Sequence, residues 1–184
     1  LQQRLSQQGY RYHVINASIS GDTTRNGLSR LPRLITKHRP NIIIIALGAN
    51  DGLRGLPLSE MQHNLSRLIT ISQQHKSQVV LAGIRLPPNY GVLFNTRFAH
   101  IYEQLAQQFQ IPLLPRLLHQ VADHSELMQA DGMHPHARQG VDGITRHSQR
   151  GGFMIHQDAV SATPADNISD LVIGDRYAGN GIGQ

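Results

Sequence analysis

Short apolar runs alternate along the chain with longer segments whose apolar residues recur every three or four positions. Four runs have the length of buried β-strands and lie at residues 13–17, 42–47, 79–84 and 111–114. Three segments show helical spacing and lie at residues 28–35, 58–69 and 98–109. Strands that alternate with helices are typical of a parallel sheet with crossover helices, so the pattern predicts an α/β fold.

The isoleucines at residues 42–45 form an apolar run without any polar interruption. A strand with one solvent-exposed face would alternate apolar and polar residues, so this strand is expected to be central and covered on both faces. In open sheets of this kind, ligands bind outside the carboxyl ends of the strands. Residues that bind or react with a ligand are therefore expected in the loops at residues 18–22, at residues 48–52 and around Asp131.

The pattern changes after Pro135. Residues 138–184 carry eight of the 17 glycines in the chain and show no sustained helical stripe, although short apolar runs remain at 153–155 and 171–173. We therefore divide the chain into a partial α/β domain at residues 1–137 and an atypical tail at residues 138–184. Two interpretations of the tail stay open, a poorly packed or disordered segment and an extra structured element.

Composition narrows the classes of protein that the chain can belong to. Its 184 residues, 39% of them hydrophobic, suffice for the core of one domain. No apolar run approaches the roughly 18 to 20 residues of a membrane span, so a soluble chain is expected. The sequence has no cysteine, and its 11 histidines lack a coherent ligand spacing, so neither a disulfide framework nor a metal site is predicted.

The net charge of +5 and the isoelectric point near 10.1 raise the question of nucleic-acid binding. The lysines and arginines are scattered as single positions, without a basic run and with little aromatic interleaving. This distribution does not favour a nucleic-acid partner.

A possible catalytic dyad lies in the sequence Asp131-Gly132-Met133-His134. Asp131 can accept a hydrogen bond from one ring nitrogen of His134, which leaves the other nitrogen free to act as a general base. Taken alone, the spacing is more often that of a surface turn, because Asp-Gly is a common turn dipeptide.

Two other positions offer hydrogen-bond donors for a developing oxyanion. The side-chain amide of Asn50 directly follows the apolar strand, and the backbone N–H of Gly21 lies near a helix start, where donors are unpaired. Each of these residues alone is typical of an ordinary loop. Their order along the chain, ahead of Asp131 and His134, is more informative than any one of them.

The blocks at residues 16–23, 47–55, 84–91 and 131–135 resemble the second to fifth sequence blocks of the SGNH (GDSL-type) hydrolase superfamily, specifically its thioesterase I, arylesterase and lysophospholipase group. The likeness covers roughly residues 1–135. It implies a three-layer α/β/α flavodoxin-like fold and a serine acyl-enzyme mechanism that needs no cofactor. The implied substrates are small acyl thioesters, aryl esters and lysophospholipids.

The same resemblance assigns roles to single residues. Gly21 and Asn50 would be oxyanion donors, His134 the general base and Asp131 the residue that orients it. A substrate loop that covers the acyl chain would contain Arg85, Pro87, Asn89 and Tyr90. The alternative for this loop is a rigid proline-rich connection without a substrate role.

The sequence departs from the family at the nucleophile. The family serine belongs to a Gly-Asp-Ser-Leu block after the first strand, and no such block occurs here. The similar Gly21-Asp22-Thr23-Thr24 already belongs to the glycine block, which makes Thr23 a poor nucleophile candidate. We expect a fragment that lacks the first strand and the serine and is inactive on esters.

The alternative to an inactive hydrolase is a non-catalytic module that binds acyl chains or lipids with the same fold. In either case the expected partner is a small acyl ester or thioester, without stable membrane insertion, bound to a monomer. By the resemblance, the full-length bacterial protein would be periplasmic or secreted.

Overall fold

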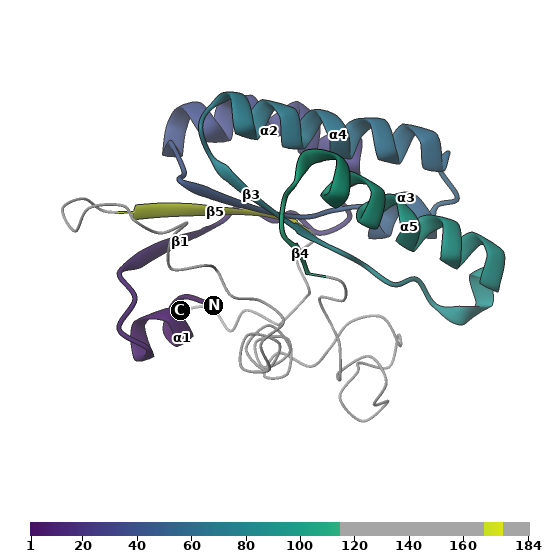
Figure 1. Cartoon of the computed structure of the whole chain (residues 1–184), viewed down its shortest axis with the longest axis horizontal. Coiled ribbons are helices and arrows are strands. Elements are labelled where there is room, and N and C mark those ends of the chain that lie inside the picture. Colours follow the sequence, from purple (N-terminus) through teal and green to yellow (C-terminus); the bar gives the residue numbers. More distant parts are fainter. Residues whose placement is uncertain (115–167, 175–184) are drawn as a thin grey trace. The chain divides into compact units, whose positions relative to one another are not determined.

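The computed structural model describes residues 1–114 and 168–174. Helices and strands alternate along most of this chain (Figure 1). Their bounds are α1 Gln2–Gln7, β1 Tyr12–Asn16, α2 Thr24–His38, β2 Ile42–Ala46, α3 Ala49–Leu53, α4 Leu58–Gln74, β3 Gln78–Ala82, the 3₁₀ turn η1 Pro88–Tyr90, α5 Val92–Phe109, β4 Leu113–Leu114 and β5 Ile168–Gly174. Residues 14–114 and 169–174 belong to one compact unit, which holds helices α2 to α5 and most of the sheet, while residues 1–13 belong to another.

The five strands form one sheet in the order β1-β5-β2-β3-β4. Strand β2 runs parallel to both of its neighbours, and Ile43 pairs with Val79 of β3 on one side and with Leu171 of β5 on the other. Strand β3 runs parallel to β4. The parallel sheet with intervening helices confirms the α/β fold that the hydrophobic pattern predicts.

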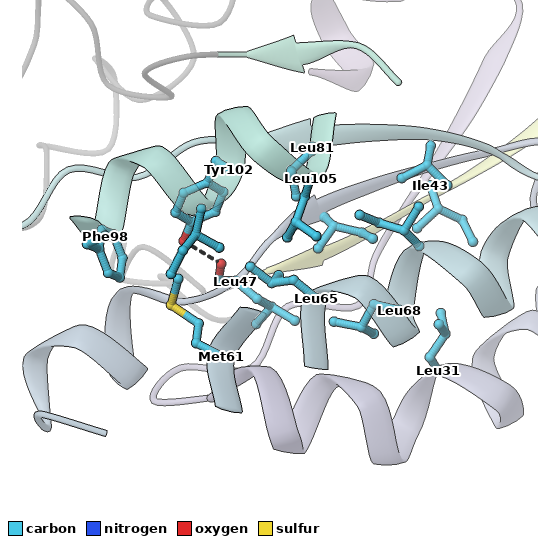
Figure 2. Close-up of a cluster of buried hydrophobic side chains, with 14 of the residues drawn as sticks. Leu31, Ile43, Leu47, Met61, Leu65, Leu68, Leu81, Phe98, Tyr102 and Leu105 are labelled. Carbon is cyan, nitrogen blue, oxygen red and sulfur yellow. Dashed lines mark hydrogen bonds between the residues drawn. The ribbon is translucent and has the colours of Figure 1, made fainter. Parts of the chain in front are cut away.

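One face of the sheet packs against α2, α4 and α5. The side chains of Ile43 and Ile45 lie opposite Val79 and Leu81 of β3, and all four are buried in a single apolar cluster. The helices add buried side chains to the same cluster, and Figure 2 labels Leu31, Met61, Leu65, Leu68, Phe98, Tyr102 and Leu105 among them. The helices also contribute Ile35, Ile69 and Ile101 to the cluster. Each such side chain contributes about 1.5 to 3 kcal/mol on burial, so this cluster holds the helices on the sheet.

Successive side chains of a strand point to opposite faces, so Ile42 and Ile44 face away from this cluster. Both are only half-buried, whereas Ile43 and Ile45 are fully buried. We expected both faces of β2 to be covered. Among the described residues, the face that packs against the helices is fully covered and the opposite face is half-buried.

The expected strands agree with β1, β2 and β3 to within two residues at each end, whereas β4 is shorter than the run at residues 111–114. Four short elements, α1, α3, η1 and β5, were not among the expected strands and helices. Helix α3 forms where a turn was expected, and β5 is a structured element within the tail. The remainder of residues 138–184 lies outside the described residues. No helix of the described ranges is both long and apolar enough to span a membrane.

Candidate functional site

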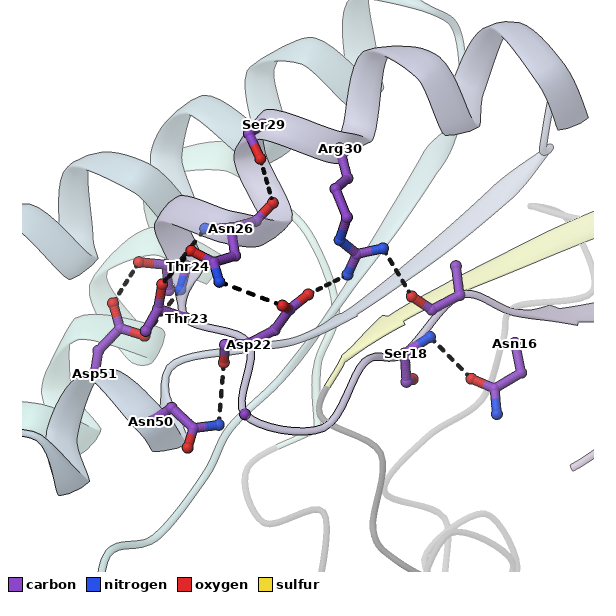
Figure 3. Close-up of polar contacts among 12 residues, drawn as sticks. Asn16, Ser18, Asp22, Thr23, Thr24, Asn26, Ser29, Arg30, Asn50 and Asp51 are labelled. Atoms are coloured by element: carbon purple, nitrogen blue, oxygen red, sulfur yellow. Dashed lines mark hydrogen bonds and ion pairs between the residues drawn. The ribbon is translucent and has the colours of Figure 1, made fainter. Parts of the chain in front are cut away.

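The loop after β1 is joined to helix α3 after β2, and this contact brings the two expected oxyanion donors to one edge of the sheet. The side-chain Nδ2 of Asn50 donates a hydrogen bond to the carbonyl oxygen of Asp22 at 3.1 Å (Figure 3). Gly21, directly before Asp22, adopts a φ of +82°, which favours glycine. The guanidinium of Arg54 donates to the Gly21 carbonyl oxygen at 2.9 Å, which adds a second link between loop and helix.

The carboxylate of Asp51 is a buried link between α3 and the start of α2. Its two oxygens accept from the backbone N–H of Thr24 at 2.8 Å and from the Thr24 hydroxyl at 2.5 Å. That hydroxyl oxygen in turn accepts from Nδ2 of Asn64 on α4 at 3.1 Å. Because the first N–H groups of a helix have no partner within the helix, Asp51 satisfies a donor that would otherwise be buried without one.

Burial raises the pKa of Asp51 above its ordinary value, because desolvation penalises the charged form. The two hydrogen bonds from Thr24 act in the opposite direction, and the charge of Glu60 adds to the rise. Asp51 is 2% exposed, which places it in the structural frame of the site rather than on the surface where a substrate would bind.

Asp22 fixes the loop from the side of α2. Its carboxylate forms an ion pair with Arg30, and its other oxygen accepts from Nδ2 of Asn26 at 3.4 Å (Figure 3). Arg30 also donates to the carbonyl oxygen of Ala17 at 3.0 Å, near the start of the loop. Thr23 is the N-cap of α2 and accepts from the N–H of Asn26, so its hydroxyl has a structural role.

The turn that leads from β2 into α3 is held by Tyr102. Its hydroxyl donates to the carbonyl oxygen of Leu47 at 2.9 Å (Figure 2). Gly48, the next residue, has a φ of +122°, and a Cβ atom placed on it would lie 2.2 Å from the Tyr102 hydroxyl oxygen. The position of Asn50 therefore depends on a glycine that no larger residue can replace without displacing Tyr102.

The proposed substrate loop is tied to the same short helix. The Tyr90 hydroxyl donates to the Leu53 carbonyl oxygen at 3.0 Å, and Asn95 donates to the Pro87 carbonyl oxygen at 3.1 Å. Leu86 is 3% exposed and packs closely on Gly52. A Cβ atom placed on Gly52 would lie only 2.5 Å from the Cδ1 atom of Leu86. These contacts anchor the loop, while they leave Arg85 and Asn89 exposed and Pro87 and Tyr90 half-buried.

Two apolar side chains beside this loop are open to solvent. Val92 and Leu93, in the first turn of α5, are 84% and 66% exposed. A separate shallow depression of about 260 Å³ lies over α4 and α5, and its lining contains none of the expected site residues. Ile19, in the loop that contains Gly21, is another large apolar side chain that is open to solvent, at 47% exposed.

Asp131 and His134 lie outside the described residues, so the dyad stays a prediction. The structure brings Gly21 and Asn50 together and places Arg85, Pro87, Asn89 and Tyr90 in a loop bonded to α3. The residues that hold these elements in place were not predicted from the sequence; they are Asp51, Thr24, Asn64, Arg54 and Tyr102. Asp51 had a visible signal, because a charged residue directly after an apolar strand requires a partner if it is buried.

Several known proteins are similar to this chain in sequence and in structure. The model of the GDSL-like Lipase/Acylhydrolase family matches residues 1–139. The arylesterase of Vibrio mimicus is 47% identical over 131 residues, which are 71% of this chain and 66% of that protein. Thioesterase 1/protease 1/lysophospholipase L1 of Escherichia coli K12 is 43% identical over 122 residues, which are 66% of this chain and 59% of that protein.

The fold also agrees with a solved structure. The crystal structure of TesA superposes with a TM-score of 0.77 and 40% sequence identity, covering 80% of this chain and 82% of that one. The chain thus spans about two thirds or less of the two curated relatives named above, and a larger share of this solved structure.

Proposed function

Because the chain belongs to the GDSL-like lipase/acylhydrolase family, we propose that the sheet edge at Gly21 and Asn50 is an acyl site built for hydrolysis of esters and thioesters. The observation that carries the proposal is the hydrogen bond from Asn50 to the Asp22 carbonyl, which joins the two donor-bearing loops. The names of the relatives, an arylesterase and a thioesterase/lysophospholipase, support ester and thioester chemistry.

The chemistry for which this site is built is acyl transfer through a serine, a nucleophile that no Gly-Asp-Ser-Leu block supplies in this chain. A serine oxygen attacks the carbonyl carbon, and the oxyanion that forms accepts hydrogen bonds from the Gly21 N–H and the Asn50 amide. His134 takes the serine proton and passes it to the leaving alkoxide or thiolate, while Asp131 orients the imidazole. Water then attacks the acyl-enzyme and releases a carboxylate.

The amide of Asn50 suits this role because its Nδ2 is a hydrogen-bond donor held in place by the fold. Its hydrogen bond to the Asp22 carbonyl oxygen fixes the plane of the amide before any substrate binds. A donor fixed in advance requires no reorganisation when negative charge develops, which is the reason why such donors accelerate acyl transfer.

A second function, binding of an acyl chain without turnover, is favoured by the exposed Val92 and Leu93. Both side chains lie at the start of α5, directly after the proposed substrate loop. Exposed apolar side chains that follow the proposed substrate loop would suit the apolar part of an amphiphile with a carboxylate or ester head.

The acyl site can be tested without catalysis. Octanoate, the product-like carboxylate, is titrated into ¹⁵N-labelled protein, and the backbone amide of Gly21 and the side-chain amide of Asn50 are expected to shift together. Asn50→Ala should weaken binding by about 10- to 150-fold, since a hydrogen bond to a charged group contributes about 1.5 to 3 kcal/mol. The exposed Asn41→Ala serves as the matched control and should bind as the wild type does.

Shifts confined to the depression over α4 and α5, or equal octanoate affinity of Asn50→Ala and Asn41→Ala, would contradict this placement of the acyl site.

We also propose that the chain as it stands does not turn esters over, because it contains no Gly-Asp-Ser-Leu block. With p-nitrophenyl butyrate and octanoyl-CoA, product release by the wild type should equal that of His134→Ala and of the buffer. Loss of the nucleophile of a serine triad reduces turnover by on the order of 10⁶. Hydrolysis by the wild type that His134→Ala abolishes and His63→Ala preserves would refute the inactivity.

A further inference from the structure

Large apolar side chains that are open to solvent gather at one edge of the sheet. Among residues 14–114, the large apolar side chains that are exposed are Ile19, Val92 and Leu93. Ile19 belongs to the loop after β1, and the other two directly follow the loop after β3. Hydrogen bonds join both of these loops to α3, the helix that follows β2. The three side chains therefore lie at the edge of the sheet where α3 begins.

Val92 and Leu93 protrude from the surface. They are the most exposed of the three, and neither lines the depression over α4 and α5. The turn that carries them is held on its other side, where the half-buried Phe94 packs on the ring of Tyr90 with 6.4 Å between the ring centroids. A pocket for a single small ligand is concave, whereas these two side chains stand out from a turn that its neighbours fix.

Cationic side chains accompany the exposed apolar groups. Arg97 lies one helical turn after Leu93, so the two share a face of α5. Arg54 ends α3, and Arg85 belongs to the loop after β3. All three arginines are exposed, and residues 61–102 contain no aspartate or glutamate. The segment that carries Val92 and Leu93 is therefore basic as well as apolar.

The carboxylates near this edge are buried or paired. Asp22 is buried and forms an ion pair with Arg30, and Asp51 is buried against the start of α2. Glu60, in the first turn of α4, forms an ion pair with Arg25 at 2.8 Å. Among the described residues, the exposed charged groups at the ends of the loops after β1 and β3 are therefore positive.

We propose that this edge docks reversibly on an anionic phospholipid bilayer, with Val92 and Leu93 inserted among the lipids. The inference goes beyond the proposed acyl site, because docking requires no turnover. Aliphatic side chains gain free energy by leaving water, and a guanidinium binds a phosphate through two parallel hydrogen bonds. Combined apolar and electrostatic contacts of this size give reversible binding at the headgroup level.

A folded protein partner fits this edge less well than a lipid surface. Specific protein interfaces bury about 1,200 to 2,000 Å² and use aromatic side chains as anchors. The exposed large apolar side chains at this edge are three aliphatic ones on two separate segments, surrounded by arginines. A bilayer accepts separate apolar side chains, since each of them inserts among the lipids on its own.

The chain contains no cysteine, so a single introduced cysteine can report which surface meets the bilayer. Leu93→Cys is labelled with the fluorophore NBD, and Thr36→Cys, at an exposed position near the far end of α2, is the matched control. Both are mixed with vesicles of equal parts phosphatidylglycerol and phosphatidylcholine. The emission of NBD at residue 93 should shift to the blue and gain intensity, because the label leaves water. The emission at residue 36 should stay unchanged.

Vesicle composition and charge variants test the electrostatic part. Phosphatidylcholine vesicles should bind the protein at least about 10-fold more weakly, because each basic residue near an anionic surface contributes about 5-fold. Arg97→Gln should likewise weaken binding to the mixed vesicles by about 5-fold. Arg33→Gln, an exposed position on α2, should bind nearly as the wild type does. High salt should release the protein, since it screens these charges.

The apolar part is tested by replacing both protruding side chains. The double variant Val92→Ser, Leu93→Ser should bind the mixed vesicles at least about 10-fold more weakly than the wild type, because the apolar surface that leaves water is lost. Both positions are exposed, so its free energy of unfolding should equal that of the wild type. Equal vesicle affinity of the folded double variant and the wild type would overturn the proposal.

Three further results would contradict docking at this edge. They are equal affinity for both kinds of vesicle, an NBD shift at residue 36 as large as that at residue 93, and a shift at residue 93 that grows with protein concentration without vesicles. The last result would assign the edge to a second copy of the chain. If octanoate shifts the Asn50 amide but vesicles are not bound, docking alone fails. If vesicles bind through residue 93 and octanoate shifts nothing, the acyl site alone fails.

Discussion

Gly48→Ala should destabilise the protein by about 3 to 5 kcal/mol, because two independent costs meet at this residue. The φ of +122° is one that side chains rarely adopt, and such backbone strain costs on the order of 1 to 3 kcal/mol. The added Cβ would lie 2.2 Å from the Tyr102 hydroxyl oxygen and 3.2 Å from the Met61 sulfur. Overpacking of this kind costs about 1 to 3 kcal/mol more. The measurement is the free energy of unfolding by chemical denaturation.

Gly55→Ala is the matched control for this variant. Gly55 also has a positive φ, of +64°, but nothing lies within 4 Å of a Cβ placed there. Gly55→Ala should therefore reduce the free energy of unfolding by about 1 to 2 kcal/mol, which is the backbone contribution alone. Tyr102→Phe removes the nearest atom, so it should be less destabilising in the Gly48→Ala background than in the wild type. Equal losses for Gly48→Ala and Gly55→Ala would exclude the proposed contact with Tyr102.

Asp51→Ala should reduce the free energy of unfolding by about 2 to 4 kcal/mol. The substitution removes the acceptor for the N–H and the hydroxyl of Thr24, both of which are buried. A buried donor left without a partner costs about 1 to 3 kcal/mol, and loss of an acceptor at a helix start adds a similar amount. Denaturant titration, with Glu103→Ala as an exposed acidic control, measures the difference.

The pH dependence of Asp51 gives a second measure of the same contact. Because its pKa is raised on folding, the folded state binds the proton more tightly than the unfolded state. The contribution of Asp51 is therefore largest below its ordinary pKa of about 3.9 and declines as pH rises through the raised value. The stability advantage of the wild type over Asp51→Asn should shrink with rising pH. An advantage that grows over this range would mean that the Thr24 hydrogen bonds outweigh desolvation.

Local patterns in the sequence were sufficient for the elements that pack by periodicity. The apolar stripes of α2, α4 and α5 and the run at residues 42–45 predicted both the helices and the strand that they cover. The meeting of Gly21 and Asn50 was also predictable, because parallel strands end at one edge of a sheet. Their role as donors stays a prediction, as do those of Asp131 and His134.

Contacts between distant segments were not predictable from one sequence. Asp51 and Thr24 are 27 residues apart, and nothing in either neighbourhood indicates the other. The turn sequence at Gly48 gave no sign of helix α3. The turn before this helix is held by a hydrogen bond from the Tyr102 hydroxyl to the Leu47 carbonyl oxygen, and these two residues are 55 positions apart. The strand at Leu171 was a three-residue apolar run in a glycine-rich tail. Its pairing depends on a gap between β1 and β2 that only the assembled sheet provides.

The late position of β5 has a consequence for synthesis on the ribosome. During translation, β2, β3 and β4 emerge together with the helices that cover them and can form their parallel pairs early. The inner edge of β2 stays unpaired until residues 168–174 have left the exit tunnel. An unpaired edge of isoleucines is a template for pairing with other chains. A nascent chain of this protein would therefore be a client for chaperones until its last described strand is made.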